Sequence, residues 1–324
     1  MSSSELEHAA EVIRGASSVA LACHVGPDGD ALGSTLALHH LCRAYGKPSV
    51  ASWPEPFEVA PHYRYLPGLD LATKPADFPA APEVMVTFDC GSLDRLGCLA
   101  DSATAAGELV VVDHHASNHR FGTVNVVDTE AAATAVLVRE LARVLDWPLT
   151  RDAAICLYTG LVTDTGRFQY ANTTPSVFAL AQELSAFDLP IESMTRQLFE
   201  QHRFAYLQMA GACLARAELD RELSFVATWV TNFDLDGFEV DLEETEGLID
   251  LVRRTAEADV ACVCKETTEG IRVSLRSVRD DIDVSLVAAR FGGGGHRFAA
   301  GFTAPYPVTD VIGGIKGVLR ELRG

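Results

Sequence analysis

The sequence has no long apolar run. No stretch approaches the ~18 apolar residues that a helix needs to cross a bilayer. The first residues, Met1 to His8, also lack the basic and apolar regions of a secretory signal. These two absences predict a cytoplasmic protein that does not enter a membrane.

Positive charge is scarce as well. The chain has 26 Lys and Arg against 45 Asp and Glu, a formal net charge of −19. A protein that coats long nucleic acid neutralises phosphates with a basic surface, which this composition does not supply. The balance excludes long polyanions as partners. It does not exclude a small anionic substrate, because bound cations can reverse the local field.

The eight cysteines show no spacing of a disulfide framework, so we expect reduced thiols. Cys262 and Cys264 alternate within a strand-like run, but no second pair or nearby histidine accompanies them. A zinc site is therefore not expected. Internal repeats and low-complexity segments are also absent from the sequence.

A length of 324 residues with 48% hydrophobic residues predicts two domains and an ample core. The first part alternates strand-like and helix-like segments. The expected strands are 18–24, 83–89 and 109–113, and the expected helices are 34–45, 131–145 and 152–162. This alternation predicts an α/β fold, with a mostly parallel sheet and helices on both faces.

The second part begins with a helical stretch, residues 174–217, in which Pro190 separates two helices and 194–217 forms one long helix. Strand-like alternation follows. The expected strands are 223–231, 260–266 and 271–277, with helices at 244–255 and 309–322. We therefore expect a catalytic domain (1–188), a helical connector (189–220) and a smaller α/β domain (221–324).

Histidines and aspartates follow three of the apolar runs. The segments are His24 to Asp30, Asp89 and Asp113 to His115, and Asp164 ends a predicted helix. Runs such as Val84 to Phe88 are typical of buried parallel strands, and open α/β sheets bind ligands outside the carboxyl ends of their strands. The four segments should therefore converge on one cleft.

Carboxylate and imidazole suit divalent ions such as Mn²⁺, Mg²⁺ or Co²⁺. In a binuclear centre a carboxylate bridges ions that are ~3.5–4 Å apart. The candidate ligands are His24, Asp28, Asp30, Asp89, His114 and Asp164. Each segment alone also has an ordinary explanation, such as a turn, a cap or a solvated loop. The metal site is favoured because these explanations would need four coincidences in one domain.

Two glycines in the first segment have expected roles. Gly29 would let the backbone turn so that Asp28 and Asp30 both face the cleft. Gly33 and Ser34 would begin the next helix, whose free amides could hold a phosphate.

A second cluster is the run Arg290-Phe291-Gly292-Gly293-Gly294-Gly295-His296. Consecutive glycine amides can form a concave anion site, and His296 can donate to a phosphate or sugar oxygen. Arg276 is a second candidate, because guanidinium binds phosphate in a bidentate fork. The alternative is a flexible hinge. The expected substrate-binding residues are Arg276, Arg290, Gly293, Gly294, Gly295 and His296.

Taken together, the pattern resembles the Asp-His-His (DHH) phosphoesterase family in its two-domain form with a DHHA1-type C-terminal domain. The matching residues are His24, Pro27, Asp28, Asp30, Gly33, Ser34, Asp89, Asp113 to His115, Asp164 to Phe168 and Gly292 to His296. The resemblance covers essentially the whole chain. It is greatest to the short oligoribonuclease (nanoRNase) and phosphoadenosine-phosphate (PAP) phosphatase type, which includes cyclic-di-AMP phosphodiesterases.

The resemblance implies a division of the ligands between two ions, with Mn²⁺ preferred. One ion would be held by His24, Asp28 and Asp89, and the other by Asp30, Asp89, His114 and Asp164. His115 would face the scissile phosphate, and Asp113 would orient the histidines. Relatives also suggest a homodimer through the N-terminal domain.

The expected reaction is attack of a water on phosphorus, with Asp89, Asp113 and His115 as catalytic residues. Expected substrates are short: linear dinucleotides such as pApA, oligoribonucleotides of a few residues, cyclic-di-AMP, or a nucleoside bisphosphate. Two other functions remain open. A manganese inorganic pyrophosphatase uses a similar ligand set, and a non-catalytic sensor could bind a cyclic dinucleotide, although an intact ligand set disfavours the sensor.

Overall fold

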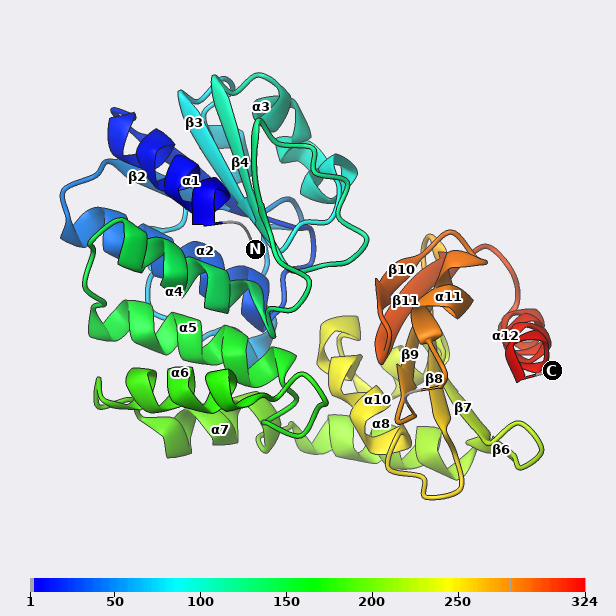
Figure 1. Cartoon of the computed structure of the whole chain (residues 1–324). Helices are drawn as coiled ribbons and strands as arrows, with labels where there is room; N and C mark the ends of the chain where they lie inside the picture. The colour runs from blue at the N-terminus through cyan, green and yellow to red at the C-terminus, as the bar shows by residue number, and fades with distance from the viewer. Residues whose placement is uncertain (1–2, 280, 324) are drawn as a thin grey trace. The chain divides into compact units, whose positions relative to one another are not determined.

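The computed structural model describes residues 3–279 and 281–323. The chain divides into two compact units, Met1–Glu200 and Gln201–Gly324 (Figure 1). Within the described residues, no helix combines the length and the apolar character that a membrane span requires.

The first unit carries a five-stranded parallel sheet in the order β2-β1-β3-β4-β5. Its strands are β1 (Val19–Cys23), β2 (Ser49–Ser52), β3 (Val84–Phe88), β4 (Glu108–Asp113) and β5 (Val124–Val127). Its helices are α1 (Ser3–Gly15), α2 (Gly29–Ala44), α3 (Ala100–Thr104), α4 (Thr134–Val144), α5 (Arg151–Asp164), α6 (Pro175–Ser185) and α7 (Ile191–Phe199). Short 3₁₀ helices include Leu93–Leu99.

Both faces of this sheet are buried, because alternate residues of each strand enter different cores. Leu21 and Val86 join the core that α1, α2, α4 and α5 complete. Met85 and Val111 join the core that Leu96 and the segment around α3 cover. The predicted α/β class with helices on both faces is confirmed.

The second unit carries a mixed six-stranded sheet in the order β10-β11-β9-β8-β7-β6. Its strands are β6 (Glu218–Asp220), β7 (Phe225–Val230), β8 (Val260–Thr267), β9 (Gly270–Ser277), β10 (Gly294–His296) and β11 (Ala299–Ala304). Its helices are α8 (Phe204–Ala215), α9 (Asn232–Phe238), α10 (Leu248–Val252), α11 (Val284–Ala289) and α12 (Val308–Arg323). One face packs on α11 and α12, and part of the other packs on α8 and α10.

The expected long helix 194–217 is wrong. It is two helices, α7 and α8, separated at Glu200 to Arg203, where every residue is exposed and polar and none can anchor a continuous helix. Met194 of α7 belongs to the core of the first unit, and Met209 of α8 to a core of the second. Residues 189–220, expected as a connector, are thus divided between the units.

The expected helix 244–255 is also shorter than predicted. A 3₁₀ segment, Leu242–Gly247, precedes α10, which ends at Val252.

Candidate metal centre

Three polar segments lie at the carboxyl ends of the central strands β1, β3 and β4 of the first sheet. Cys23 of β1 pairs with Phe88 of β3, which pairs in turn with Val112 of β4. The next residues along these strands are His24, Asp89 and Asp113. Because the strands are parallel and in register, these residues leave the sheet side by side, as the sequence predicted.

Asp89 lies at the middle of the group and is 4% exposed. Its Oδ2 is 3.5 Å from Nε2 of His24, and its Oδ1 is 3.5 Å from Nε2 of His114 and from Nδ1 of His115. The backbone of Asp89 has a φ of 54°, in the left-handed region that non-glycine residues rarely adopt. Such strain is found where the surrounding structure holds a residue in a required position.

The histidine rings are oriented by acceptors on their Nδ1 side. Nδ1 of His24 lies 2.9 Å from the carbonyl oxygen of Val25, and Nδ1 of His114 lies 3.1 Å from that of Ala131. A carbonyl only accepts, so Nδ1 of His114 donates to Ala131, whereas Nδ1 of His24 also has the guanidinium of Arg95, a donor, at 3.2 Å. Nε2 of both rings faces the carboxylates, and in His114 it is then the nitrogen with the lone pair that a metal ion needs.

Asp113 orients His115 but not the ring of His114. The Oδ1 of Asp113 accepts from Nδ1 of His115 at 2.8 Å and from the backbone amide of His114 at 2.8 Å. Asp113 is fully buried, and its Oδ2 accepts from Nδ2 of Asn118 at 2.5 Å. The Asp-His-His segment is therefore held as one rigid turn.

Asp30 is held by the first turn of α4. Its Oδ2 accepts from the amide of Thr134 at 2.6 Å and its Oδ1 from the amide of Ala135 at 2.9 Å. The hydroxyl of Thr134 donates to Oδ1 of Asp89 at 3.0 Å. These amides lie at a helix N-terminus, where the macrodipole favours an anion. Thr134 thus fixes two of the candidate ligands at once.

The expected roles of the glycines near Asp28 are wrong. Asp28 caps α2 by accepting from the amides of Asp30 and Ala31, so the helix begins at Gly29 rather than at Ser34. The amides of Gly33 and Ser34 therefore lie inside the helix and cannot hold a phosphate. Gly29 has no unusual backbone angle. It lacks a side chain because a Cβ there would lie 2.7 Å from Thr163 of α5.

Two sets of potential ligand atoms share Asp89. His24, Asp28 and Asp89 form one set and Asp30, Asp89 and His114 a second, with the atoms of each set within 4.8 Å of one another; Asp89 also forms a third such set with Asp113 and His115. Asp164, the last residue of α5, adds its Oδ2 at 3.1 Å from Nε2 of His114. The structure thus brings together all six residues that the sequence predicted as metal ligands.

The electrostatics of this group fit bound divalent cations. Burial, and then the carboxylates of Asp164 and Asp89, raise the pKa of Asp30 well above its ordinary value. Burial also raises the pKa of Asp164 to about 6, although His114 opposes the shift. Burial acts on Asp89 in the same direction, but His115, His24 and His114 outweigh it and lower its pKa. Divalent cations among these crowded carboxylates would relieve their repulsion, and the donor types suit Mn²⁺, Mg²⁺ or Co²⁺.

Sequence reasoning missed several residues that support the site. Thr134 and Asn118 were not singled out, because a hydroxyl or amide that contacts a buried carboxylate leaves no periodic signal. Arg95, on the 3₁₀ helix Leu93–Leu99, was also missed. Its Nη2 lies 3.2 Å from Nδ1 of His24, and its carbonyl oxygen accepts from the amide of Val25.

In the second unit, Arg276 and His296 lie in the same row of the sheet. His296 of β10 pairs with Ala299 of β11, which pairs with Arg276 of β9. Two strand spacings separate them, about 10 Å. Nε of Arg276 is buried and has no hydrogen-bond partner among the described residues.

The glycine run differs from the expected anion site. The amide of Gly292 donates to the carbonyl of Ala289, and that of Gly293 to the carbonyl of Ala288, so both close the end of α11. Gly294 and the residues after it form β10. A Cβ on Gly293 would lie 2.2 Å from the carbonyl oxygen of Gly301, which explains its lack of a side chain by close strand packing.

The structure does not place Arg290 with Arg276 and His296. Its Nη2 is 3.6 Å from Oε2 of Glu321 on α12. That helix packs on the face of the sheet that carries Val273 and Leu275, opposite to the face of Arg276. The glycine segment turns the chain between α11 and β10, so residues near each other in sequence reach different faces.

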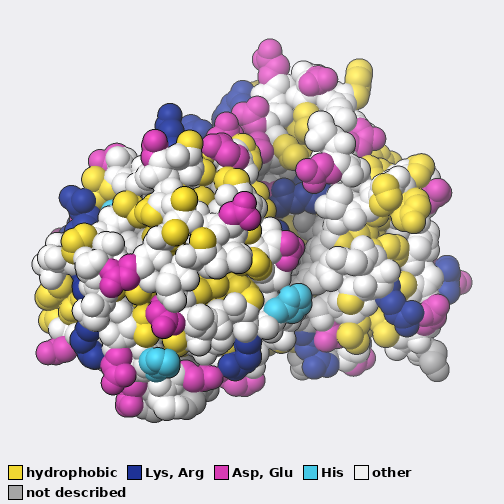
Figure 2. Space-filling view, turned by 90° about the horizontal axis from the view of Figure 1, so that it is seen from above, with side chains coloured by type: hydrophobic (Ala, Val, Ile, Leu, Met, Phe, Trp, Pro, Cys, Tyr) yellow, Lys and Arg dark blue, Asp and Glu magenta, His cyan; other side chains and the backbone are white. Residues whose placement is uncertain are grey.

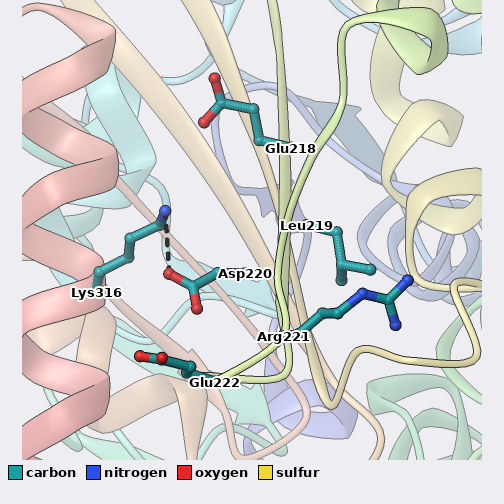
Figure 3. A pocket seen from close by; sticks show the side chains of 6 residues that line it. All are labelled: Glu218, Leu219, Asp220, Arg221, Glu222 and Lys316. Atoms are coloured by element: carbon teal, nitrogen blue, oxygen red, sulfur yellow. Dashed lines mark ion pairs between the residues drawn. The ribbon is translucent and has the colours of Figure 1, made fainter.

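A shallow hollow of about 700 Å³ lies elsewhere in the second unit, beside β6 and α12. Figure 3 shows Lys316 directed at Asp220, which it approaches to 3.2 Å, with Glu218 and Glu222 nearby. None of its lining residues was predicted as a site residue, and the ion pair satisfies its only lysine.

Comparisons with known proteins agree with the two-unit organisation. Residues 18–161 match the DHH family N-terminal domain, and residues 222–317 match the DHHA1 domain. The chain is 32% identical over 286 residues to the bifunctional oligoribonuclease and PAP phosphatase NrnA of Thermus thermophilus. The aligned region covers 87% of this chain and 83% of that protein.

Solved structures share the fold at lower identity. An exopolyphosphatase-related protein from Bacteroides fragilis superposes with a TM-score of 0.86 at 22% identity, covering 100% of this chain and 98% of that one. RecJ from Thermus thermophilus, solved with Mn²⁺, gives a TM-score of 0.56 at 14% identity, covering 98% of this chain and 55% of that one.

Proposed function

The chain belongs to the DHH family, and on that premise we propose that it is a divalent-cation-dependent hydrolase of short nucleotide phosphoesters. The observation that carries the proposal is the buried group around Asp89, in which two sets of ligand atoms share one carboxylate. That arrangement is suited to a pair of ions acting on a phosphoryl group.

We assign the ligands as the resemblance implies. His24, Asp28 and Asp89 would hold one ion, and Asp30, Asp89, His114 and Asp164 would hold the other. Mn²⁺ is the proposed ion, with Mg²⁺ or Co²⁺ as substitutes. When bound, the ions neutralise charge on the phosphoryl oxygens and lower the pKa of the attacking water.

The chain's own residues orient and stabilise the reacting group. The hydrogen bond from His115 to Asp113 fixes the imidazole so that Nε2 faces away from Asp113. We propose that this edge contacts the non-bridging phosphoryl oxygens. The protonated ring would stabilise negative charge there. Burial lowers the pKa of His115, but the carboxylates of Asp89 and Asp113 outweigh burial and raise that pKa above its ordinary value.

Short substrates fit the charge distribution. Acidic and basic side chains are interspersed over the face that Figure 2 shows, and the net charge of −19 disfavours long polyanions. The Thermus relative is named for oligoribonuclease and PAP phosphatase activities. We propose that pApA, oligoribonucleotides of a few residues and 3′-phosphoadenosine 5′-phosphate are substrates, with cyclic-di-AMP a further candidate, and that the active form is a homodimer.

In the second unit, Arg276 and His296 are the proposed contacts to the remote phosphate or sugar. Binding at a point away from the reacting phosphate orients the substrate. If Arg276→Ala and His296→Ala both leave the KM and kcat for pApA unchanged, this assignment is wrong.

The test of the function is hydrolysis of four compounds by the purified protein with Mn²⁺. The compounds are pApA, cyclic-di-AMP, 3′-phosphoadenosine 5′-phosphate and pyrophosphate. We expect turnover of pApA, its loss in Asp89→Ala, and its retention in Asp70→Ala, which removes an exposed carboxylate outside the site. Hydrolysis of pyrophosphate alone would instead indicate a pyrophosphatase. Nucleotide binding without turnover would indicate a sensor.

A further inference from the structure

Half of one face of the second sheet is not covered by helices. On β7 and β8, residues such as Val230 and Val263 are buried against α8 and α10. On β9, β11 and β10, the residues that point to the same side are exposed or half-buried. These residues are Arg272, Ser274, Arg276, Ala299, Gly301, Thr303, Gly294 and His296.

Strand register arranges this surface in three rows. One end row is Lys265, Arg272 and Thr303, and the other is Arg276, Ala299 and His296. Between them lie Ser274, Gly301 and Gly294, whose small size leaves the middle of the surface flat. A Cβ on Gly294 would meet no atom of the described residues within 4 Å, so there is open space at this position.

The end row at Arg272 carries excess positive charge. Lys265 is 1% exposed, and its Nζ donates to Oε1 of Glu246 at 2.8 Å. Nη2 of Arg272 is 3.6 Å from the same oxygen, and the Arg272 side chain is 49% exposed. Within residues 3–279 and 281–323, no other carboxylate forms an ion pair with Arg272, and none forms one with Arg276. The single carboxylate of Glu246 therefore pairs with two cations, Lys265 and Arg272, in a chain whose net charge is −19.

The spacing of the two arginines suits a ligand with an anion at each end. They are four residues apart on β9, which corresponds to about 13 Å along the strand. Both side chains are long and can reach toward the small residues between them. A nucleoside can lie over the row of Ser274 and Gly301, with one anionic group toward Arg276 and a second toward Arg272.

We propose that Arg272 forms a second anion subsite, held in place by Glu246, so that the second unit can bind two phosphate groups of a nucleotide in addition to the phosphate that reacts in the first unit. This inference rests on the proposed function, because it assumes that the surface around Arg276 binds substrate. It assigns a specificity-determining role to a residue that the proposed mechanism does not use.

The test is calorimetric binding of two ligands to the full chain in EDTA, where hydrolysis does not interfere. The ligands are 3′-phosphoadenosine 5′-phosphate and adenosine 5′-monophosphate. We expect wild type to prefer the bisphosphate. Arg272→Ala should weaken bisphosphate binding by roughly 10- to 100-fold, the effect of a lost hydrogen bond to a charged group, and leave monophosphate binding unchanged. Arg276→Ala should weaken the binding of both ligands.

Two further variants make the result specific. Arg254→Ala removes another exposed arginine of the second unit and should change neither affinity. Arg272→Lys keeps the charge and should retain most of the preference, which separates loss of the subsite from damage to the fold. The inference is overturned if wild type binds neither ligand, or if Arg272→Ala affects both ligands equally or not at all. The hydrolysis of the four compounds with Mn²⁺ tests the proposed function independently of these binding measurements.

Discussion

Single side chains outside the proposed ligand set hold the residues of the candidate metal centre in place. Asn118 is such a residue, because its amide bridges Oδ2 of Asp113 and the carbonyl oxygen of Cys90. Without it, the carboxylate that orients His115 loses a partner in a buried position. Groups that support ligands in this way typically change metal affinity or activity by about 10- to 100-fold when they are removed.

We therefore expect Asn118→Ala to lower Mn²⁺-dependent kcat/KM for pApA by that amount, with little change in secondary structure. Ser117→Ala, at the exposed neighbouring position, is the control. Equal activity of the two variants would show that Asn118 does not order the site.

His39 is a buried residue with a consequence for stability rather than for catalysis. Burial, and then His40 and Arg43, lower its pKa from 6.5 to about 4. Between these pH values the unfolded chain binds a proton that the folded chain does not, so folding stability falls as the pH decreases from 6.5 to 4. The shift corresponds to at most about 3 kcal/mol.

His39→Gln should therefore lose less stability than wild type between pH 7 and pH 4.5, as measured by urea unfolding. His8→Gln, at an exposed position, should behave like wild type. The same acid sensitivity in all three proteins would contradict the assignment.

At the scale of elements, the close approach of α2 and α5 holds the ligand-bearing ends of these helices together. Gly33 makes it possible, since a Cβ there would lie 2.4 Å from the carbonyl oxygen of Cys156. Backbone atoms cannot move aside as a flexible side chain can. Gly33→Ala should therefore destabilise the protein by about 1–3 kcal/mol, as overpacking generally does.

Gly211→Ala is the matched control, because it lies in α8 with no atom near its Cβ position. There alanine should stabilise the helix by up to about 1 kcal/mol. Thermal unfolding of both variants checks the sign of each effect. If Gly33→Ala leaves the stability unchanged, α2 and α5 can move apart with little loss of free energy.

Elements with strong local signals could be predicted from the sequence, and short ones could not. The buried runs of β1, β3 and β4 were identified because each is mostly apolar and a polar residue follows its apolar part. β2 and β5 have only four residues each, too few for a periodic pattern. The start of α2 was misplaced because Pro27 to Asp30 is typical of a turn, whereas Asp28 in fact caps the helix.

The candidate site was more predictable than the fold around it. The ligands are marked by residue type and by their position after strands, both of which are local. The roles of Thr134 and Asn118 depend on which strands and helices become neighbours. Which elements become neighbours follows from tertiary packing and cannot be predicted from the sequence of one segment.

At the scale of the whole molecule, we propose that the two units carry separate functions. All six candidate metal ligands belong to the first unit, and the Arg272 and Arg276 surface belongs to the second. Each unit also has its own hydrophobic cores. We therefore expect Arg276→Ala to leave Mn²⁺ binding unchanged, and Asp89→Ala to leave nucleotide binding in EDTA unchanged. Calorimetry of both variants with Mn²⁺ and, separately, with nucleotide tests this independence. Loss of Mn²⁺ binding in Arg276→Ala together with loss of nucleotide binding in Asp89→Ala would contradict it.

The central claim is that Asp89 is shared by two bound cations. The most direct measurement is the number of Mn²⁺ ions per chain, obtained by equilibrium dialysis and elemental analysis of wild type and Asp89→Ala at neutral pH. The account predicts two ions per wild-type chain and loss of both tight sites in the variant. A single ion in wild type, or two ions in Asp89→Ala, would contradict it.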